Sequence, residues 1–262
     1  MDFANLRLVK VVFQDIEKQG REQGCVFVRV RPQLPRTDKN MQLLKGLGLK
    51  LAPMYLSVEF AGILDLRKSE EEILAGASQG FRRKLRKAEK NEVIVEKSQD
   101  PEVIKDFYRI QLETAERQKF YAFSEDFLEK QFRAFAENDE VVMYIAKLGD
   151  EILAMNFIVF YGAEASYHYG VSSGLGTKYS AAPLLHMEAM RDARERGIKR
   201  YNLWGIVEKD ETEHRFYGVS EFKRSFGCEE LRYTPAHDLV LEPTRYLATK
   251  VIEGVRKKVR RV

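Results

Sequence analysis

Three β-type segments follow one another between residues 141 and 170 and are separated only by short turns. Residues 141–147 and 151–161 flank the tripeptide Leu148-Gly149-Asp150, and the third segment, 164–170, follows a turn at Gly162. A glycine-containing turn between two apolar runs is typical of a β-hairpin. These segments therefore predict three consecutive antiparallel strands, around which the remaining elements pack.

Helices are predicted before and after these strands. Ser69 is followed three residues later by Glu72, the pattern of a capping box that opens a helix. A helical face formed by Phe81, Leu85 and Ala88 comes next, and residues 171–182 are expected to form a loop. Other helices are predicted at 5–20, 41–47, 101–119, 124–137, 183–196, 218–226 and 245–262, and strands at 25–30, 55–66, 93–95, 200–206 and 230–234.

Composition excludes several classes of protein. The 262 residues are 44% hydrophobic, too many for a disordered chain, and two cysteines, Cys25 and Cys228, exclude a disulfide-built mini-protein. No apolar run approaches the roughly 18 residues of a membrane span. Residues 1–13 lack the pattern of a signal peptide. We expect a cytoplasmic globular protein of one or two domains.

Positive charge is concentrated in two places. Residues 245–262 contribute +6 to a net charge of +4, so the rest of the chain is acidic. A second basic cluster lies between residues 82 and 90. Localised basic patches attract the phosphates of nucleic acids, nucleotides or lipid headgroups, although solvated helical faces have the same composition.

The order of elements from Asp65 to Thr234 is helices, antiparallel strands, loop–helix–strand, helix and strand. This order resembles a GNAT-type acyltransferase domain, an analogy of fold alone. The segment before Asp65 repeats only the latter half of such a domain. The sequence thus predicts an α+β protein with a mixed sheet.

Residues 218–227 read Gly-Val-Ser-Glu-Phe-Lys-Arg-Ser-Phe-Gly, with Gly227 expected to end a helix in the left-handed conformation. Their Gly-x-x-x-Phe-Lys-x-x-Phe-Gly pattern resembles the Fem family (FemABX), aminoacyl-tRNA-dependent transferases that build peptidoglycan cross-bridges. Asn202 departs from that family, which frequently has aspartate there. The resemblance covers Val9 to Leu247, and further matches in the same order lie at 69–90, 167–173, 183–190 and 201–205.

The resemblance implies tandem GNAT-like domains. Residues 1–64 would form a partial first domain that is N-terminally truncated, to which a C-terminal helix at 235–262 returns. Residues 65–234 would form a complete second domain.

The resemblance also implies a reaction. The amine of a peptidoglycan-precursor stem peptide would attack the ester carbonyl of an aminoacyl-tRNA, with no acetyl-CoA or other cofactor. The partners would be aminoacyl-tRNA and a nucleotide- or lipid-linked precursor, the latter at the inner face of the cell membrane. Residues 245–262 would make weak peripheral contact with that membrane.

The resemblance makes Lys223, in its Phe-Lys element, the strongest catalytic candidate, and Val219, Phe222 and Phe226 on one side of the helix would fix its direction. An ammonium group can stabilise a developing oxyanion or neutralise a phosphate at the tRNA 3′ end. Phe222 is a candidate to stack on the terminal adenine. Asp65, at a strand end, is a candidate to orient or deprotonate the attacking amine. The alternatives are an exposed lysine, a core phenylalanine and a turn aspartate.

Arginines near residue 82 are substrate-binding candidates. The forked guanidinium groups of Arg82, Arg83 and Arg86 match phosphate oxygens of tRNA or of the precursor's diphosphate. The alternative is a solvated helix face.

Two tyrosines complete the candidate set. Tyr167 and Tyr169 alternate along a strand, which predicts both on one sheet face and His168 on the other. They would line the acceptor channel or belong to the core. The histidines lack metal-ligand spacing, so no metal is expected.

Two other functions stay open. An acyl-CoA-dependent N-acyltransferase would use residues 171–182 to hold phosphate, although that loop has few glycines and no Arg or Gln. A non-catalytic tRNA- or membrane-binding module would account for the basic clusters alone.

Overall fold

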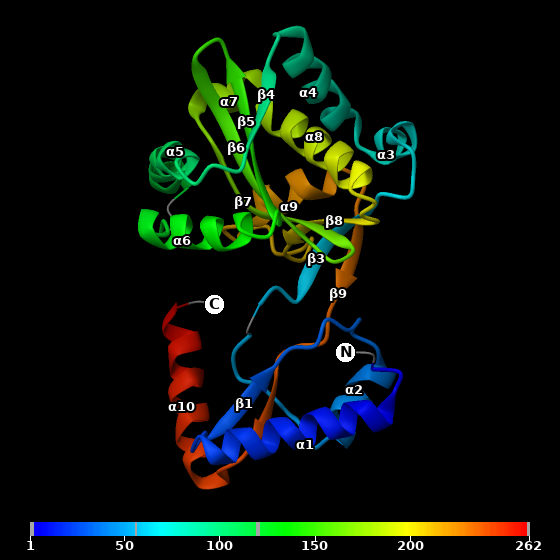
Figure 1. The fold of residues 1–262 in the computed structure, drawn as a ribbon, viewed down its shortest axis with the longest axis vertical. Coiled ribbons are helices and arrows are strands. Elements are labelled where there is room, and N and C mark those ends of the chain that lie inside the picture. Colours follow the sequence, from blue (N-terminus) through cyan, green and yellow to red (C-terminus); the bar gives the residue numbers. More distant parts are fainter. Residues whose placement is uncertain (1–2, 56, 119–120, 261–262) are drawn as a thin grey trace. The chain divides into compact units, whose positions relative to one another are not determined.

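The computed structural model describes residues 3–55, 57–118 and 121–260. The chain forms two compact units, one of residues 1–60 with 231–262 and one of residues 61–230, and each is described by itself (Figure 1). The expected boundary between residues 64 and 65 therefore falls inside a strand.

The larger unit is built on a seven-stranded mixed sheet with the order β4-β5-β6-β7-β8-β3-β9. The predicted hairpins are confirmed, because β5-β6 and β6-β7 pair antiparallel, whereas β7 and β8 run parallel. The strands are β3 (Phe60–Asp65), β4 (Ile94–Ser98), β5 (Val141–Leu148), β6 (Glu151–Tyr161), β7 (Glu164–Ser172), β8 (Arg200–Gly205) and β9 (Glu229–Arg232).

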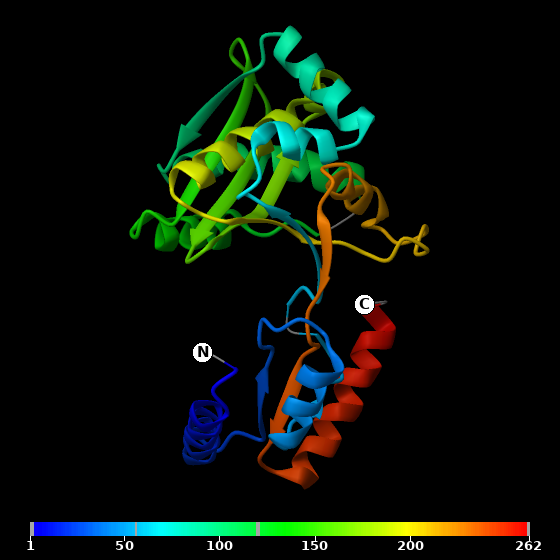
Figure 2. The ribbon, with the colours of Figure 1, turned by 90° about the vertical axis from the view of Figure 1, so that its right-hand side faces the viewer.

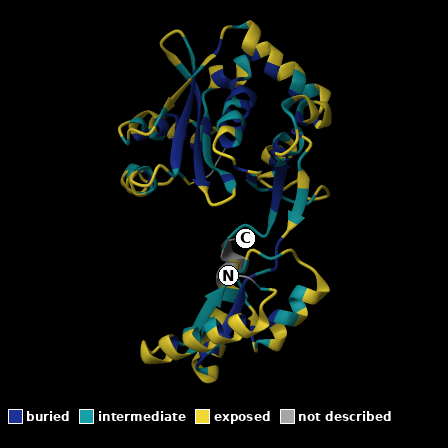
Figure 3. Cartoon of the chain, turned by 45° about the vertical axis from the view of Figure 1, so that its right-hand side comes forward, coloured by how far each residue is buried: buried dark blue, intermediate teal, exposed yellow. Residues whose placement is uncertain are grey.

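Helices cover both faces of this sheet, and two separate apolar cores result. One core contains residues of α3 (Glu70–Gly76), α4 (Gln79–Lys90) and α8 (Ala181–Glu195). The other contains residues of α5 (Val103–Gln118) and α6 (Glu125–Ala136). Figure 3 shows that the central strands and α8 are the most deeply buried elements. The mixed α+β class is thus confirmed.

Local chemistry explains the ends of several helices. Ser69 and Glu72 form the predicted capping box of α3. Gly227 adopts φ +74° after α9 (Tyr217–Arg224), as its position predicts. A Cβ at Gly227 would lie 2.2 Å from the Gly76 carbonyl oxygen, so only glycine fits between the helix ends.

The expected loop at 171–182 contains a short helix, α7 (Gly174–Tyr179). Ser173 caps it by accepting a hydrogen bond from the Gly176 amide. Ser180, at φ +60°, separates α7 from α8, which begins at Ala181 rather than at Pro183. Gly174 and Gly176 lower the helix propensity of this segment, and the cap by Ser173 offsets this in the folded chain.

The prediction for the tyrosines of β7 is wrong. The β6-β7 register shifts so that Phe157 pairs with Tyr169 and Ile158 with Tyr167, which leaves His168 as the extra residue of a bulge. Tyr167 therefore packs in the core with α8, and Tyr169 in the core with α5 and α6. His168 lies on the side of Tyr169, with 4.1 Å between their ring centroids. A bulge breaks the two-residue alternation on which the prediction rested.

The smaller unit has a three-stranded sheet of order β1-β10-β2, all antiparallel. The expected helix at 235–262 is wrong at its start, because residues 237–240 form the central strand. A short strand with one buried charge, Asp238, carries no clear periodicity. The elements are α1 (Leu6–Glu22), β1 (Phe27–Val30), α2 (Asp38–Gly46), β2 (Lys50–Leu51), β10 (His237–Val240) and α10 (Pro243–Arg260).

Helices α1 and α10 lie on opposite sides of this sheet (Figure 2), and its two faces differ in chemistry. One face carries Val28 and Leu239 into an apolar core with α1 and α2. The other face binds α10 through Arg29, which donates two hydrogen bonds each to Asp238 and Glu253 at 2.7–3.1 Å. Asp238 is fully buried and also accepts a hydrogen bond from the hydroxyl of Tyr246. Charge pairing therefore anchors α10.

Replacing Arg29 with alanine should strongly destabilise the smaller unit. Two carboxylates would lose their shared cation while Asp238 stays buried. The free energy of unfolding should therefore fall by about 3 kcal/mol or more. Native-state hydrogen exchange of the β1 and β10 amides reports on this sheet alone. Arg245→Ala is the control, since Arg245 forms an exposed pair with Glu242 and should change little. Equal protection in both variants would contradict the proposed role of the ion-pair network.

Candidate functional site

The parallel strands β7 and β8 diverge near the middle of the larger sheet. Their pairing covers Glu164–Arg200, Ala165–Tyr201 and Ser166–Asn202. Strand divergence leaves backbone groups and side chains free to face a ligand, and ligands commonly bind at such points in α/β sheets. The candidate site therefore begins where this pairing ends, after Ser166 on β7 and Asn202 on β8.

Asn202 helps to turn β8 away from β7. Its Oδ1 accepts a hydrogen bond from the Trp204 amide, and its Nδ2 donates to Glu164 on β7. Trp204 adopts φ +67°, an uncommon conformation for a bulky residue. The Asn202 side chain satisfies the backbone at this turn, just before Gly205 at the end of β8.

Lys223 comes from α9 and reaches the end of β8. Its Nζ donates a hydrogen bond to the Gly205 carbonyl oxygen at 2.7 Å, and only 6% of the residue is exposed. The ring of Tyr167 lies below, 5.7 Å from Nζ to the ring centroid. The lysine is thus held at the point where β7 and β8 separate.

Burial lowers the pKa of Lys223 to about 7, because removing an ammonium group from water disfavours the charged form. No carboxylate forms an ion pair with its Nζ within residues 3–55, 57–118 and 121–260. Both protonation states are consequently populated near neutral pH, a property suited to proton transfer.

A histidine lies next to this lysine and Tyr167. Burial first, and the charge of Lys223 second, lower the pKa of His186 to about 3. Its Nδ1 is 2.8 Å from the Tyr201 hydroxyl, while its buried Nε2 has no hydrogen-bond partner in the described chain. The ring centroids of His186 and Tyr167 are 4.5 Å apart. At neutral pH His186 is therefore uncharged, and Lys223 remains the group that titrates.

A second orphaned polar atom faces the same core. Asn156 on β6 is paired with Gly170 on β7. The Tyr167 hydroxyl takes the space next to Gly170 that a side chain would need, because a Cβ on Gly170 would lie only 1.9 Å from it. The buried Nδ2 of Asn156 has no partner among the residues that the structure describes. Buried polar groups are usually satisfied, so unpaired ones mark a place for a ligand or water. The sequence analysis did not predict Asn156 or His186 as site residues. Each is a polar residue within a run of apolar ones, and that pattern is the signal that could have indicated them.

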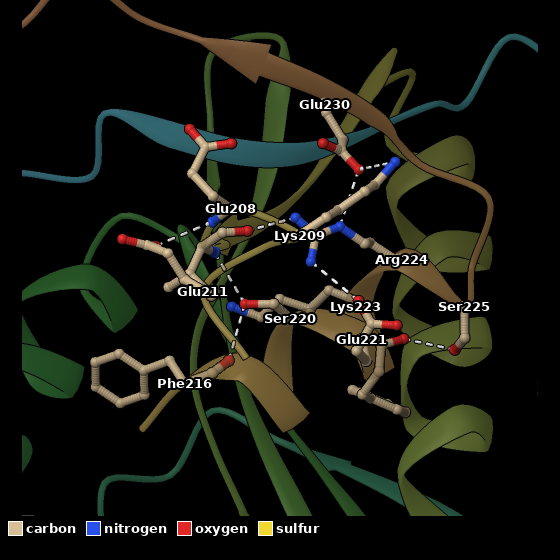
Figure 4. A network of polar contacts seen from close by, with 12 residues as sticks. Glu208, Lys209, Glu211, Phe216, Ser220, Glu221, Lys223, Arg224, Ser225 and Glu230 are labelled. Carbon is tan, nitrogen blue, oxygen red and sulfur yellow. Dashed lines mark hydrogen bonds and ion pairs between the residues drawn. The ribbon is translucent and has the colours of Figure 1, made fainter. Parts of the chain in front are cut away.

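The loop after β8 is tied to α9 by polar contacts (Figure 4). Arg224 donates to the Val207 carbonyl oxygen and pairs with Glu230 at 2.9 Å. The Ser220 hydroxyl accepts from the Val207 amide and donates to the Phe216 carbonyl oxygen. These contacts hold the helix that carries Lys223.

The other predicted residues occupy different places. Phe222 is half-buried and packs its ring against His186 and Phe226, in the manner of a core residue. Asp65 lies opposite Arg200, at the far end of β8 from Gly205, about 16 Å away at the usual strand rise. Hydrogen bonds from Arg67 lower the pKa of Asp65 to about 2, which makes it a weak base.

The arginines of α4 divide into two kinds. The Nη1 of Arg82 donates to backbone carbonyls at the C-terminal end of α3, including that of Ala77 at 2.6 Å. Arg83 and Arg86 are exposed.

Tyr169, on the other sheet face, packs near Phe123. The structure thus brings Tyr167, Phe222 and Lys223 together and leaves the other candidates elsewhere in the unit.

No cluster of three or more metal-ligating side chains occurs in the described residues.

Comparison with known proteins agrees with this fold. The profile of the acetyltransferase (GNAT) domain family matches residues 76–224, more than half of the chain. The chain belongs to the GNAT domain family. Over 98% of its length it is 20% identical to the lipid II:glycine glycyltransferase of Staphylococcus haemolyticus, of which it covers 78%.

Solved structures show the same architecture. The crystal structure of FemX superposes with a TM-score of 0.86 at 19% identity, covering 95% of this chain and 81% of that chain. A tandem GNAT protein from the clavulanic acid biosynthesis pathway reaches a TM-score of 0.51 at 12% identity, covering 88% of this chain and 69% of that chain. At these identities the likeness concerns the fold alone.

The residues before α8 do not fit the diphosphate of an acyl-CoA. Amides that would face a phosphate are occupied, since Ser173 donates to the Leu153 carbonyl oxygen and Gly174 donates to the carboxylate of Glu113. Arg117 pairs with that carboxylate at 3.4 Å. A Cβ at Gly176 would lie 2.0 Å from the Leu153 oxygen, so this glycine serves close packing.

The pKa of Lys223 predicts a pH-dependent stability. Above pH 7 the folded chain holds this lysine neutral, whereas the unfolded chain keeps it protonated up to about pH 10.4. Relative to Lys223→Met, the wild-type free energy of unfolding should therefore rise by up to about 1.4 kcal/mol per pH unit in this interval. Urea unfolding followed by the fluorescence of Trp204 measures it. If the free energy of unfolding changes with pH in the same way in the wild type and in Lys223→Met, the pKa of Lys223 is not lowered. Lys209→Met, at an exposed lysine, is the control.

Proposed function

We propose that this chain transfers an amino acid from aminoacyl-tRNA to the stem-peptide amine of a lipid-linked peptidoglycan precursor. The observation that carries the proposal is the buried Lys223 with a near-neutral pKa at the divergence of β7 and β8. Full-length similarity to lipid II:glycine glycyltransferases and to FemX supports the reaction class and the lipid-linked acceptor. We infer membership of the Fem family on the same basis.

Lys223 is proposed as the proton carrier. Neutral Lys223 accepts a proton from the substrate ammonium, and the freed amine attacks the ester carbonyl carbon to form a C–N bond. The resulting ammonium of Lys223 stabilises the oxyanion. When the C–O bond to the terminal ribose breaks, the departing oxygen takes a proton from Lys223, which returns to its neutral form, and the attacking nitrogen releases its second proton to water, so that a neutral amide remains. No cofactor is needed, because aminoacyl-tRNA is already an activated ester.

Tyr167 and His186 are proposed to position this lysine. Their rings, in contact with each other, form the apolar surroundings that lower its pKa. Asn156, with its unpaired Nδ2, is a candidate donor to a substrate carbonyl. Asp65 is not given the role of base, because its carboxylate is engaged by Arg67 at the other end of β8.

An acyl-CoA-dependent reaction is the second candidate, and the GNAT domain match is what favours it. The amides of Ser173 and Gly174 at the start of α7 oppose it, because both already donate hydrogen bonds within the chain and are not free for the diphosphate of the cofactor. Isothermal titration of the protein with acetyl-CoA separates the two candidates directly, since only the second requires binding.

Lys223→Ala should abolish transfer. The reaction loses both its proton carrier and its cation, and general acid–base groups contribute about 100-fold or more to rate. The measurement is transfer of labelled amino acids from a charged total-tRNA pool to lipid-linked and soluble precursors. Lys209→Ala, an exposed lysine in the neighbouring loop, is the matched control and should remain active.

Two outcomes bear on the alternatives. Retained activity in Lys223→Ala would remove the lysine from the mechanism. Loss of activity in Asp65→Asn, with the fold intact, would restore Asp65 as the base in place of Lys223.

Arg83 and Arg86 should contribute to tRNA affinity. Both are exposed on α4, whereas Arg82 is engaged by backbone carbonyls. Each lost phosphate contact lowers the slope of log affinity against log salt by about 0.7 to 0.9. Filter binding of the double variant Arg83→Ala/Arg86→Ala at several salt concentrations measures that slope. The exposed pair Arg109→Ala/Arg133→Ala on α5 and α6 is the control. An unchanged slope in the α4 variant would place the tRNA elsewhere.

A further inference from the structure

Helix α10 presents an apolar stripe to solvent. Leu247, Val251 and Val255 follow one another at intervals of four residues, which places them on one side of a helix. They are 64%, 67% and 56% exposed, and Ile252 beside them is 52% exposed. Such a contiguous row on an otherwise polar helix is unusual for a surface without a partner.

The opposite side of α10 is the one that packs on its own unit. Tyr246 is buried, with its ring 5.5 Å from that of Phe27, and Glu253 is held by Arg29. At about 100° per residue, Tyr246 and Glu253 point away from the centre of the stripe. The ion-pair network thus fixes the rotation of the helix, and the stripe is directed outward.

Basic residues flank the apolar stripe. Arg245 and Lys250 are exposed and fall on its two sides at helical spacing. The helical backbone continues to Arg260. Further along the chain, the sequence has five more basic residues, namely Arg256, Lys257, Lys258, Arg260 and Arg261. Only Glu253 opposes them in residues 245–262, and Arg29 already neutralises it.

We propose that α10 lies in the interface of an anionic lipid bilayer. The outward apolar stripe would enter the boundary between headgroups and acyl chains, and the flanking cations would contact lipid phosphates. Helices that lie in such an interface combine an apolar centre with basic flanks, as here. Within the described residues no helix is long and apolar enough to cross a membrane. The proposal concerns this helix alone and does not depend on the proposed reaction.

Charge and apolarity together favour lipid over RNA. A helix that binds the phosphates of RNA turns its cations toward the ligand, whereas in residues 243–255 of α10 the apolar side chains of Leu247, Val251 and Val255 face solvent. A second copy of this helix is also disfavoured as the partner, because the density of positive charge around the stripe would be doubled in a dimer.

The test uses the full chain and lipid vesicles. Co-sedimentation compares vesicles of phosphatidylglycerol and phosphatidylcholine in equal parts with vesicles of phosphatidylcholine alone. Wild-type protein should partition at least tenfold more strongly into the anionic vesicles, and added salt should weaken this partition. The triple variant Leu247→Ser/Val251→Ser/Val255→Ser should lose at least tenfold in partition. Weak binding of wild type to both vesicles would overturn the proposal.

The matched control lies on α1, which carries Leu6, Leu8 and Val11 with exposed fractions of 44–56%. Leu6→Ser/Leu8→Ser/Val11→Ser removes similar apolar surface and should leave vesicle binding unchanged. Equal losses in both variants would overturn the assignment to α10. Light scattering and tRNA binding of the α10 variant complete the test. A dimer in the wild type that the variant loses, or lost tRNA affinity with vesicle binding kept, would assign the stripe to those partners instead.

Transfer to a soluble precursor separates this proposal from the proposed function. The α10 variant should keep that activity, because the helix is outside the Lys223 site. Vesicle binding without any transfer would support the lipid contact and contradict the proposed reaction.

Discussion

The hydrogen bond from Lys223 to the Gly205 carbonyl oxygen is the interaction on which the functional reading of this structure depends. It draws a lysine out of water without giving it a carboxylate partner in the described chain, and desolvation therefore brings its pKa to about 7. The free energy for this burial comes from the packed elements around it. Tyr167, His186 and Phe226 belong to or contact the larger core, which also contains the faces of α4 and α8.

Two backbone irregularities lie close to that lysine. The bulge at His168 reverses the direction of the side chains that follow it on β7, so that Tyr169 packs on the face of α5 and α6 while Tyr167 stays on the face of α8, beside Lys223. On β8, Trp204 leaves the extended conformation, supported by the side chain of Asn202. Both irregularities occur where the strands part. Strained or irregular backbone is commonly retained at functional sites, where the surrounding structure supports it.

Charge is organised differently in the two units. In the larger unit an uncompensated lysine is buried, whereas in the smaller unit Arg29 is shared by two carboxylates. A shared cation with several hydrogen bonds suits an anchoring role, because it fixes the orientation of α10. Only with that orientation does the apolar side of α10 face outward. A hydrophobic contact in the same place would leave the rotation of the helix less defined.

The sequence by itself determined the order of most elements of the larger unit, because turns, caps and helix stops depend on neighbouring residues. The meander of β5, β6 and β7, the capping box at Ser69 and the left-handed Gly227 follow from local rules. It also singled out Lys223, through the resemblance of residues 218–227 to the Fem pattern. Tertiary structure decided the rest. Burial of Lys223, the bulge at His168, the strand at 237–240 and the separation of Asp65 from Lys223 all depend on contacts between distant segments, which periodicity does not encode.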